Sequence, residues 1–348
     1  MKTDFDLKNI IRPTIKALKP YSSARDEFQG STDNMVFLDA NENPFENGVN
    51  RYPDPHQGKL KAILSEIKGI STKNILLGNG SDEVLDLIYR AFCEPNQDNV
   101  VILPPTYGMY EVLANLNAIG IKKVDLDTEF QPKVEVVLNS ADANSKLLFI
   151  CSPNNPSGNS FTSEAIEKMV SNFKGIVVID EAYIDFSTEK SWLTRLNEFP
   201  NLIVTQTLSK AYAMAGIRLG ICYASEEIIT VLNTIKPPYN INELTQKKAI
   251  ELLSIKDLAS NQIADILKER ETMITELQSV SYISKIYPSD ANFVLVKVDD
   301  ANKRYNQLIE KGIVIRNRTT QPGCENTLRL TIGTSEENKI VIDTLKSI

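Results

Sequence analysis

Short apolar runs alternate with amphipathic stretches between about residue 58 and residue 260. The apolar runs are rich in β-branched residues, which is typical of strands buried on both faces of a parallel sheet. The stretches between them repeat their apolar positions with the period of a helix. The predicted strands are 75–77, 100–103, 121–126, 146–151, 176–180, 202–206 and 219–223, and the predicted helices are 81–93, 107–118, 162–173 and 227–235. This alternation predicts an α/β fold with a mostly parallel, doubly wound sheet.

The two ends of the chain have different patterns. Residues 1–45 contain several proline turns and are predicted to form an N-terminal arm that joins the small domain. A longer amphipathic helix is predicted over 258–280, where it leads out of the large domain. After it, the pattern predicts strand, strand, helix, strand, strand and helix. We therefore expect a large domain over 46–260 and a small C-terminal α+β domain over 261–348.

Composition narrows the class of protein. The chain has 348 residues, 42% of them hydrophobic and 24% charged, which is ordinary for a globular protein of two domains. The formal net charge is −7 and no basic cluster occurs, which disfavours binding to nucleic acid. No apolar run approaches the ~20 residues needed to span a membrane, and the first residues do not form a signal peptide. The four cysteines form no Cys-x-x-Cys pair, so we expect free thiols in the cytoplasm.

The single histidine excludes several kinds of chemistry. His56 lies in a proline-rich segment and is expected to be exposed. A metal site built from several histidines is impossible, and a Ser-His-Asp or Cys-His mechanism would depend on this one residue. We therefore expect a chain that binds no metal and takes its chemistry from an organic cofactor.

Lys210 is the most informative candidate for binding such a cofactor. Within 207–220 the only charged residues are Lys210 and Arg218. An amine among apolar and hydroxyl side chains loses solvation in its charged form, so its pKa falls, and a neutral amine can form a Schiff base with a carbonyl. Arg218 and the hydroxyl of Ser209 could hold an anion beside it. This combination suggests pyridoxal phosphate, although most lysines are solvated and inert.

Asp180 comes at the end of the predicted strand 176–180. Ligands of doubly wound sheets bind at the carboxyl ends of the strands, and a carboxylate there could pair with the cofactor's pyridine nitrogen. Tyr183 could donate a hydrogen bond to the ring oxygen. The alternative for Asp180 is a plain helix N-cap.

Polar turns follow other predicted strands as well. Gly80-Ser81-Asp82 opens a helix and could bind phosphate, or it could simply cap that helix. Tyr107 could stack on an aromatic ring or pack in the core, and Asn155 could contact the ring oxygen or form only a turn. Alternation along the predicted strand puts Arg329 on the face opposite its apolar neighbours. On that face it could bind a carboxylate, or it could simply face solvent. Arg316 is a second arginine at a strand end.

In the order and spacing of these residues, the chain resembles the fold type I pyridoxal-phosphate-dependent aminotransferases, and among them the histidinol-phosphate aminotransferases most closely. Further matching segments are 38–44, 51–54, 80–83, 105–110, 180–183 and 328–334. The resemblance implies pyridoxal 5'-phosphate as cofactor and a homodimer. It implies transamination of L-histidinol phosphate with 2-oxoglutarate, which gives imidazole acetol phosphate and L-glutamate in histidine biosynthesis.

The resemblance also implies a role for each matching residue. Lys210 binds the cofactor covalently and moves the proton, Asp180 pairs with the pyridine nitrogen, and Tyr183 is a further catalytic residue at the ring oxygen. The remaining cofactor contacts that it implies are Asn155 at the ring oxygen, Tyr107 on the ring face, and Gly80, Ser81, Asp82, Ser209 and Arg218 at the phosphate. Tyr52 is expected to reach the phosphate in the neighbouring subunit. Tyr21, Arg316 and Arg329 are expected to bind substrate, with Arg316 near its phosphate and Arg329 at a carboxylate.

Three alternatives remain open at this point. The chain could be an aromatic amino acid aminotransferase or a threonine-phosphate decarboxylase on the same fold. It could also be a non-catalytic protein that binds the cofactor. Segment 236–242 lies where members of the family contact substrate, but no ligand is assigned to it.

Overall fold

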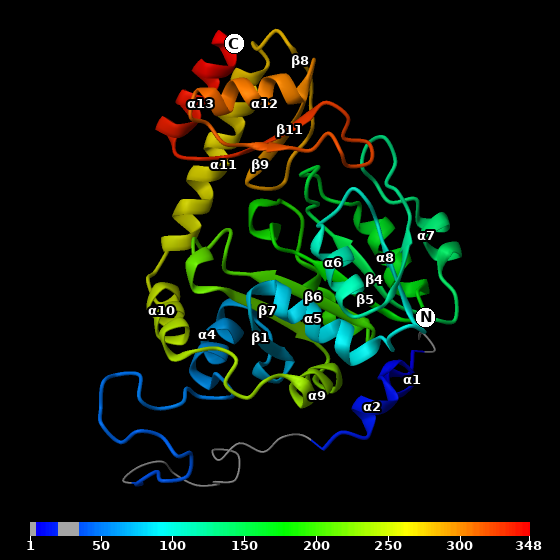
Figure 1. Cartoon of the computed structure of the whole chain (residues 1–348), viewed down its shortest axis with the longest axis vertical. Helices are drawn as coiled ribbons and strands as arrows, with labels where there is room; N and C mark the ends of the chain where they lie inside the picture. The colour runs from blue at the N-terminus through cyan, green and yellow to red at the C-terminus, as the bar shows by residue number, and fades with distance from the viewer. Residues whose placement is uncertain (1–4, 20–34) are drawn as a thin grey trace.

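A seven-stranded sheet forms the centre of the molecule. The computed structural model describes residues 5–19 and 35–348. The strand order is β1-β7-β6-β5-β4-β2-β3 (Figure 1). The strands are β1 (Ile75–Asn79), β2 (Asn99–Ile102), β3 (Gly120–Lys123), β4 (Ser145–Cys151), β5 (Ile176–Asp180), β6 (Leu202–Thr207) and β7 (Leu219–Ala224). Each predicted strand is present, and the α/β fold with a mostly parallel sheet is confirmed.

The direction of β7 is a feature of this sheet that the sequence did not predict. β7 runs antiparallel to both β1 and β6, whereas β2 to β6 pair in parallel. An antiparallel neighbour needs only a short connection, and residues 208–218 supply it without a crossover helix. The start of β7 therefore lies at the edge of the sheet where the parallel strands end.

Helices cover both faces of the sheet, which explains why its strands are apolar throughout. One face packs against α5 (Gly80–Phe92), α6 (Met109–Leu116) and α9 (Glu226–Ile235). The other packs against α4 (Gly58–Lys68), α7 (Val134–Ser140), α8 (Ser163–Asn172) and α10 (Glu243–Leu253). Helices α4, α7 and α10 were not predicted, because α4 and α7 bury at most two apolar side chains each and two of the three residues that α10 buries are polar.

The long helix α11 (Leu258–Leu277) leads to a second, four-stranded sheet of order β10-β11-β9-β8 (Figure 1). Its strands are β8 (Ile283–Ile286), β9 (Phe293–Val298), β10 (Arg316–Asn317) and β11 (Thr327–Thr331), and it packs against α11, α12 (Ala301–Glu310) and α13 (Ser335–Ser347). The predicted order of strands and helices after α11 is confirmed. The expected domain boundary at residue 260 falls in the first turn of α11 and stays a prediction.

The described part of the N-terminal arm does not lie where we expected it. Its short helices α1 (Leu7–Ile10) and α2 (Pro13–Lys16) lie by the large sheet, far from the small one (Figure 1). Leu7 and Ile10 pack against the apolar cluster under α5, and Arg12 Nε lies 3.3 Å from Glu94 Oε2. The arm joins the large domain here because its apolar side chains are partly buried against it.

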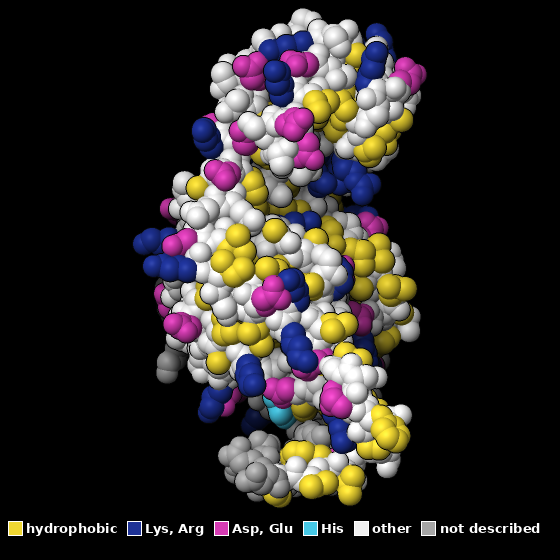
Figure 2. Space-filling model, turned by 90° about the vertical axis from the view of Figure 1, so that its left-hand side faces the viewer, with side chains coloured by type: hydrophobic (Ala, Val, Ile, Leu, Met, Phe, Trp, Pro, Cys, Tyr) yellow, Lys and Arg dark blue, Asp and Glu magenta, His cyan; other side chains and the backbone are white. Residues whose placement is uncertain are grey.

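Two general features concern the class of protein. In residues 5–19 and 35–348, no helix combines the length and apolarity that a membrane span requires. The same ranges contain no group of three or more His, Cys, Asp and Glu side chains suited to a metal ion. His56 is exposed, as predicted (Figure 2), and the four cysteines are free and buried.

Candidate active site

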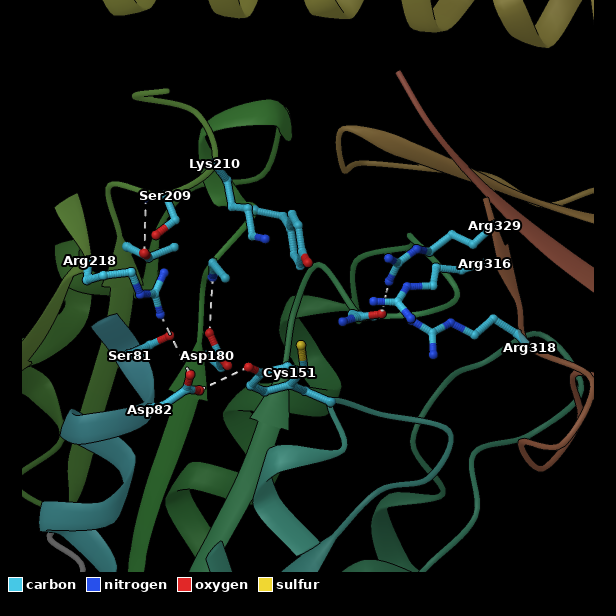
Figure 3. Close-up of a pocket in the computed structure, with 15 residues that line it drawn as sticks. Ser81, Asp82, Cys151, Asp180, Ser209, Lys210, Arg218, Arg316, Arg318 and Arg329 are labelled. Carbon is cyan, nitrogen blue, oxygen red and sulfur yellow. Dashed lines mark hydrogen bonds and ion pairs between the residues drawn. The ribbon is translucent and has the colours of Figure 1, made fainter. Parts of the chain in front are cut away.

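A cavity of about 270 Å³ opens where the parallel strands end and the small sheet faces the large one (Figure 3). It brings together most of the predicted site residues, namely Ser81, Asp82, Tyr107, Asn155, Asp180, Tyr183, Ser209, Lys210, Arg218, Arg316 and Arg329. Their loops follow different strands, and the sheet order makes them neighbours. Arg218 joins them because it precedes the antiparallel strand β7.

Lys210 lies in the loop between β6 and β7 and points into the cavity (Figure 3). Its Nζ is 5.8 Å from the centre of the Tyr183 ring. Loss of solvent, and then the positive charges of Arg329 and Arg218, lower the pKa of Lys210 below its usual value. This direction was predicted from the apolar segment around Lys210. The second cause was not, because Arg329 comes from the other sheet.

Asp180 is buried at the end of β5. Its Oδ2 accepts a hydrogen bond of 2.7 Å from the Tyr110 hydroxyl, and its Oδ1 accepts one of 3.1 Å from the Ala182 amide. Burial raises the pKa of Asp180, while these two donors act in the opposite direction. The helix-cap alternative does not apply, because only a short 3₁₀ turn follows, and its cap residue is Tyr183.

The start of α5 and Arg218 form a corner suited to an anion. The guanidinium of Arg218 lies so close to Gly80 that a Cβ on Gly80, at φ +74°, would be 2.6 Å from Nη2. Arg218 also approaches the Asp82 carboxylate at 3.9 Å, and the hydroxyl of Tyr107 donates to the same carboxylate at 2.9 Å. This corner can bind a phosphate group, because it combines a helix N-terminus with a guanidinium and the nearby hydroxyls of Ser81 and Ser209.

Three arginines face Lys210 across the cavity (Figure 3). Arg316 on β10 lies opposite Arg329 on β11, and Arg318 follows two residues after Arg316. Burial and the charge of Arg318 lower the pKa of Arg329 to about 10, and burial and Arg316 lower the pKa of Arg318. Among the described residues that line the cavity, the only carboxylates are Asp82 and Asp180, which lie beside the large sheet. This side of the cavity is therefore strongly electropositive.

Two of these arginines have nitrogen atoms without partners. The buried Nε atoms of Arg318 and Arg329 make no hydrogen bond to any described residue. Arg329 also donates to Asn155 Oδ1 at 2.5 Å, which links the small sheet to the turn after β4. Unpaired buried donors are costly, so this arrangement suits an anionic ligand that has more than one oxygen.

Sequence reasoning missed Arg318, Cys151 and Ala182, which also line the cavity. The signal for Arg318 was present, because alternation along a strand puts Arg316 and Arg318 on one side. Two of the predicted residues that the structure describes do not line the cavity. Gly80 borders it next to Arg218, and Tyr52 is 53% exposed and stacks on Tyr239, with ring centres 4.5 Å apart. Tyr21 lies outside the described residues.

Comparisons with known proteins identify relatives of the chain. The model of the class I and II aminotransferases matches residues 32–345. The chain is 64% identical over 343 residues to a histidinol-phosphate aminotransferase of Flavobacterium johnsoniae, an alignment that covers 98% of each. Its structure resembles that of the histidinol-phosphate aminotransferase of Clostridium acetobutylicum, with a TM-score of 0.79, 26% identity and coverage of 86% and 90%. The enzyme of the same name from Sinorhizobium meliloti, solved with pyridoxal-5'-phosphate, has the same fold, with a TM-score of 0.78, 23% identity and coverage of 85% and 82%.

Proposed function

Because the chain belongs to the class I and II aminotransferases, we propose that it transfers the amino group of L-histidinol phosphate to 2-oxoglutarate. The products are imidazole acetol phosphate and L-glutamate, and the reaction serves histidine biosynthesis. The observation that carries this proposal is the group of three arginines that faces Lys210 across one cavity. Both substrates are anions, and one of them carries a phosphate.

The cofactor is pyridoxal 5'-phosphate, which when bound supplies an electron sink for the carbon that carries the transferred nitrogen. The cavity fits this group, because Arg218 and the start of α5 form a phosphate corner that a side chain at Gly80 would fill. The phosphate would be held there by Ser81, Asp82, Ser209 and Arg218. Asp180 would pair with the ring nitrogen, Tyr107 would lie on the ring face, and Tyr183 and Asn155 would contact the ring oxygen.

Asn155 can form hydrogen bonds to both the cofactor and the small sheet. Its Oδ1 accepts from Arg329, which leaves its Nδ2 free to donate to the ring oxygen. The same side chain would then link the cofactor to an arginine that binds substrate. Lys210 is the group with a suitable pKa for moving a proton, and its Nζ would take the proton from the substrate carbon next to nitrogen and deliver it on the cofactor side of that nitrogen.

The arginines support a substrate with a phosphate. Guanidinium groups bind carboxylates and phosphates through two parallel hydrogen bonds, and two neighbouring positive charges favour a dianion over a monoanion. Arg316 and Arg318 would bind the phosphate of histidinol phosphate, and Arg329 a carboxylate of 2-oxoglutarate. A neutral aromatic side chain would use none of these charges, so the cluster disfavours the aromatic aminotransferase alternative.

Exposed apolar side chains support a homodimer. Val36, Leu38 and Phe45 are at least 80% exposed, and Tyr52 belongs to the same segment. Hydrophobic side chains gather at the lower end of the face drawn in Figure 2. Such a surface favours burial against a second copy, which would let Tyr52 reach the neighbouring cavity. The free, buried cysteines fit the expected location in the cytoplasm.

A spectral titration of the purified holoenzyme with histidinol phosphate tests the function. We expect the cofactor absorbance to convert to that of its amino form and to recover when 2-oxoglutarate is added. The variant Lys210→Ala should lose turnover by about a thousandfold or more, as expected when the group that moves the proton is removed. The exposed Lys73→Ala, which breaks only a surface ion pair, is the matched control.

Other donors separate the alternatives. Equal turnover with phenylalanine would overturn the assignment of histidinol phosphate, and release of carbon dioxide from threonine phosphate would indicate a decarboxylase. A protein that binds the cofactor but converts none of these donors would be a non-catalytic binder.

A further inference from the structure

A column of buried aromatic rings lies directly behind Asp180. The Tyr110 ring on α6 stacks on Phe149 of β4, with centres 4.9 Å apart, and Phe149 stacks on Tyr89 of α5 at 5.1 Å. The hydroxyl of Tyr89 donates to the backbone oxygen of Tyr110 at 2.8 Å. All three side chains are at most 1% exposed. Tyr110 is therefore held by two helices and a strand, in a position that leaves it little freedom.

The hydroxyl at the end of this column is aimed at a charged group. It donates to Asp180 Oδ2 at 2.7 Å, a short distance typical of a hydroxyl bound to a carboxylate. Asp180 has one other donor among the described residues, the Ala182 amide on Oδ1. The buried hydroxyl of Thr205, opposite Asp180 on β6, makes no hydrogen bond of good geometry, yet it lies close enough to favour the charged carboxylate weakly.

The other groups around Asp180 make its charge difficult to keep. Burial and the Asp82 carboxylate favour the neutral acid, and within residues 5–19 and 35–348 no cation forms an ion pair with Asp180. The Cys151 thiol beside it is buried and protonated, since its pKa is raised above the usual range. Tyr183 also remains protonated for the same reason. Lys210 and Asp180 attract each other electrostatically, but the pKa of Lys210 is itself lowered.

We propose that Tyr110 is a positioning residue, whose hydroxyl keeps Asp180 ionised and turns its carboxylate toward the cofactor ring. The inference rests on the proposed pairing of Asp180 with the ring nitrogen. A hydrogen bond to the charged form stabilises that form, so the buried carboxylate is ready before the cofactor binds. Tyr110 also contacts the edge of Tyr107, with ring centres 5.6 Å apart at 87°. One side chain thus supports both the partner of the ring nitrogen and the residue on the ring face.

The variant Tyr110→Phe tests this role, because it removes the hydroxyl and keeps the ring of the column. Two quantities are measured on the purified protein: the dissociation constant of pyridoxal phosphate, and the pH midpoint of the absorbance change of the bound cofactor. We expect binding to weaken roughly tenfold, the low end for losing a hydrogen bond to a charged group. We expect the pH midpoint of the cofactor absorbance change to rise. A weaker pairing between Asp180 and the ring nitrogen leaves less positive charge near Lys210, and a proton there is then held to higher pH.

Tyr89→Phe is the matched control, since it removes a buried hydroxyl from the same column without touching Asp180. It should change both quantities less than twofold. Equal effects of the two variants would mean that the column acts only through packing, which would overturn the inference. So would a Tyr110→Phe protein with the affinity and midpoint of the wild type. If the wild type itself binds no cofactor, the proposed function fails before Tyr110 is tested, and the two failures are distinguishable.

Discussion

At the scale of single residues, the chemistry depends on side chains that lose their normal solvation. Lys210, Asp180 and the arginines Arg318 and Arg329 all have shifted pKa values, and burial is the largest cause for each. Each shift favours the neutral form of the side chain. An anionic ligand or a charged cofactor ring would give these side chains new interactions in place of the solvent contacts that burial removes. Substitutions of Arg318 and of a second buried carboxylate, Glu181, test the consequences of burial for single residues.

Arg318→Gln should raise the KM for histidinol phosphate about tenfold, because a hydrogen-bonding partner of its phosphate loses its charge. The kcat should change much less, since Arg318 is not among the charges that shift the pKa of Lys210. Steady-state kinetics with histidinol phosphate measure both constants. Arg195→Gln is the control, because it alters ion pairs with Glu167 and Glu198 and contacts with the Trp192 and Phe199 rings, none of which line the cavity. An unchanged KM in Arg318→Gln would exclude Arg318 from the phosphate site.

Glu181 should make the stability of the protein depend on pH. It is buried, and it accepts hydrogen bonds from Ser191, Gln206 and the Trp192 amide, but burial dominates and raises its pKa from 4.5 to about 6. A carboxyl whose pKa is raised by folding contributes stability below pH 4.5, and this contribution is lost as the pH rises through about 6. The shift corresponds to roughly 2 kcal/mol in the free energy of unfolding.

Urea unfolding of the wild type and of Glu181→Gln between pH 4.5 and pH 8 measures this contribution. The wild type should lose roughly 2 kcal/mol relative to the variant across that range. Glu189→Gln, at an exposed position two residues before Ser191, should follow the wild type. Parallel curves for the wild type and Glu181→Gln would contradict the prediction.

At the scale of elements, the site depends on how closely the start of α5 approaches the loop before β7. Gly80 N donates to the Arg218 carbonyl at 2.9 Å, and Gly220 lies so close to the backbone of Gly80 that a side chain there would not fit. The anion corner is thus formed by backbone contact between two elements that are 138 residues apart in the chain (218 − 80 = 138).

Gly80→Ala should weaken binding of pyridoxal phosphate roughly tenfold, because a Cβ would displace Arg218 and because alanine is strained at φ +74° by about 1 kcal/mol or more. A binding titration followed by cofactor absorbance measures the change. The control is Gly108→Ala, also at the start of a helix by the cavity, where a Cβ would meet nothing within 4 Å. Similar affinities for the two variants would show that the close contact is not needed.

At the scale of the whole molecule, the cavity is built from two sheets and, as proposed, from two copies of the chain. Tyr52 lines a separate surface hollow that lies outside the cavity around Lys210. A function for Tyr52 at the cofactor therefore requires a second subunit. The two sheets meet through Arg329 and Asn155, and also through Asp290, which accepts from the Ser160 amide at 3.0 Å.

Mixing two inactive variants tests the shared site. Tyr52→Ala and Lys210→Ala subunits should each have little activity alone. When they are unfolded together and refolded, about half of the dimers should be mixed, and each mixed dimer would contain one site with both residues intact. Activity should then recover to roughly a quarter of that of the wild type. No recovery, in a sample shown to contain mixed dimers, would mean that Tyr52 acts within its own subunit, and full activity of Tyr52→Ala alone would mean that Tyr52 has no role.

The sequence by itself determined the strands of both sheets, their order along the chain and the polar turns that end them. Burial on both faces makes a strand apolar throughout, and a polar residue at its end is a local signal. Lys210, Asp180 and Arg218 could be selected on that basis, and the family resemblance added Tyr52 and Tyr21. Helices such as α7 were missed because a short helix with little burial leaves a weak periodic pattern.

Only the tertiary structure decided which distant groups meet. The antiparallel direction of β7 brings Arg218 to the edge where Asp180 lies, and no local pattern encodes the direction of a neighbouring strand. The convergence of Arg318 with Lys210, the hydrogen bond from Tyr110 to Asp180 and the contact of the arm with the large sheet are likewise long-range. They depend on packing between elements. Apolar periodicity predicts that one face of an element is buried, but it does not show which other element covers that face.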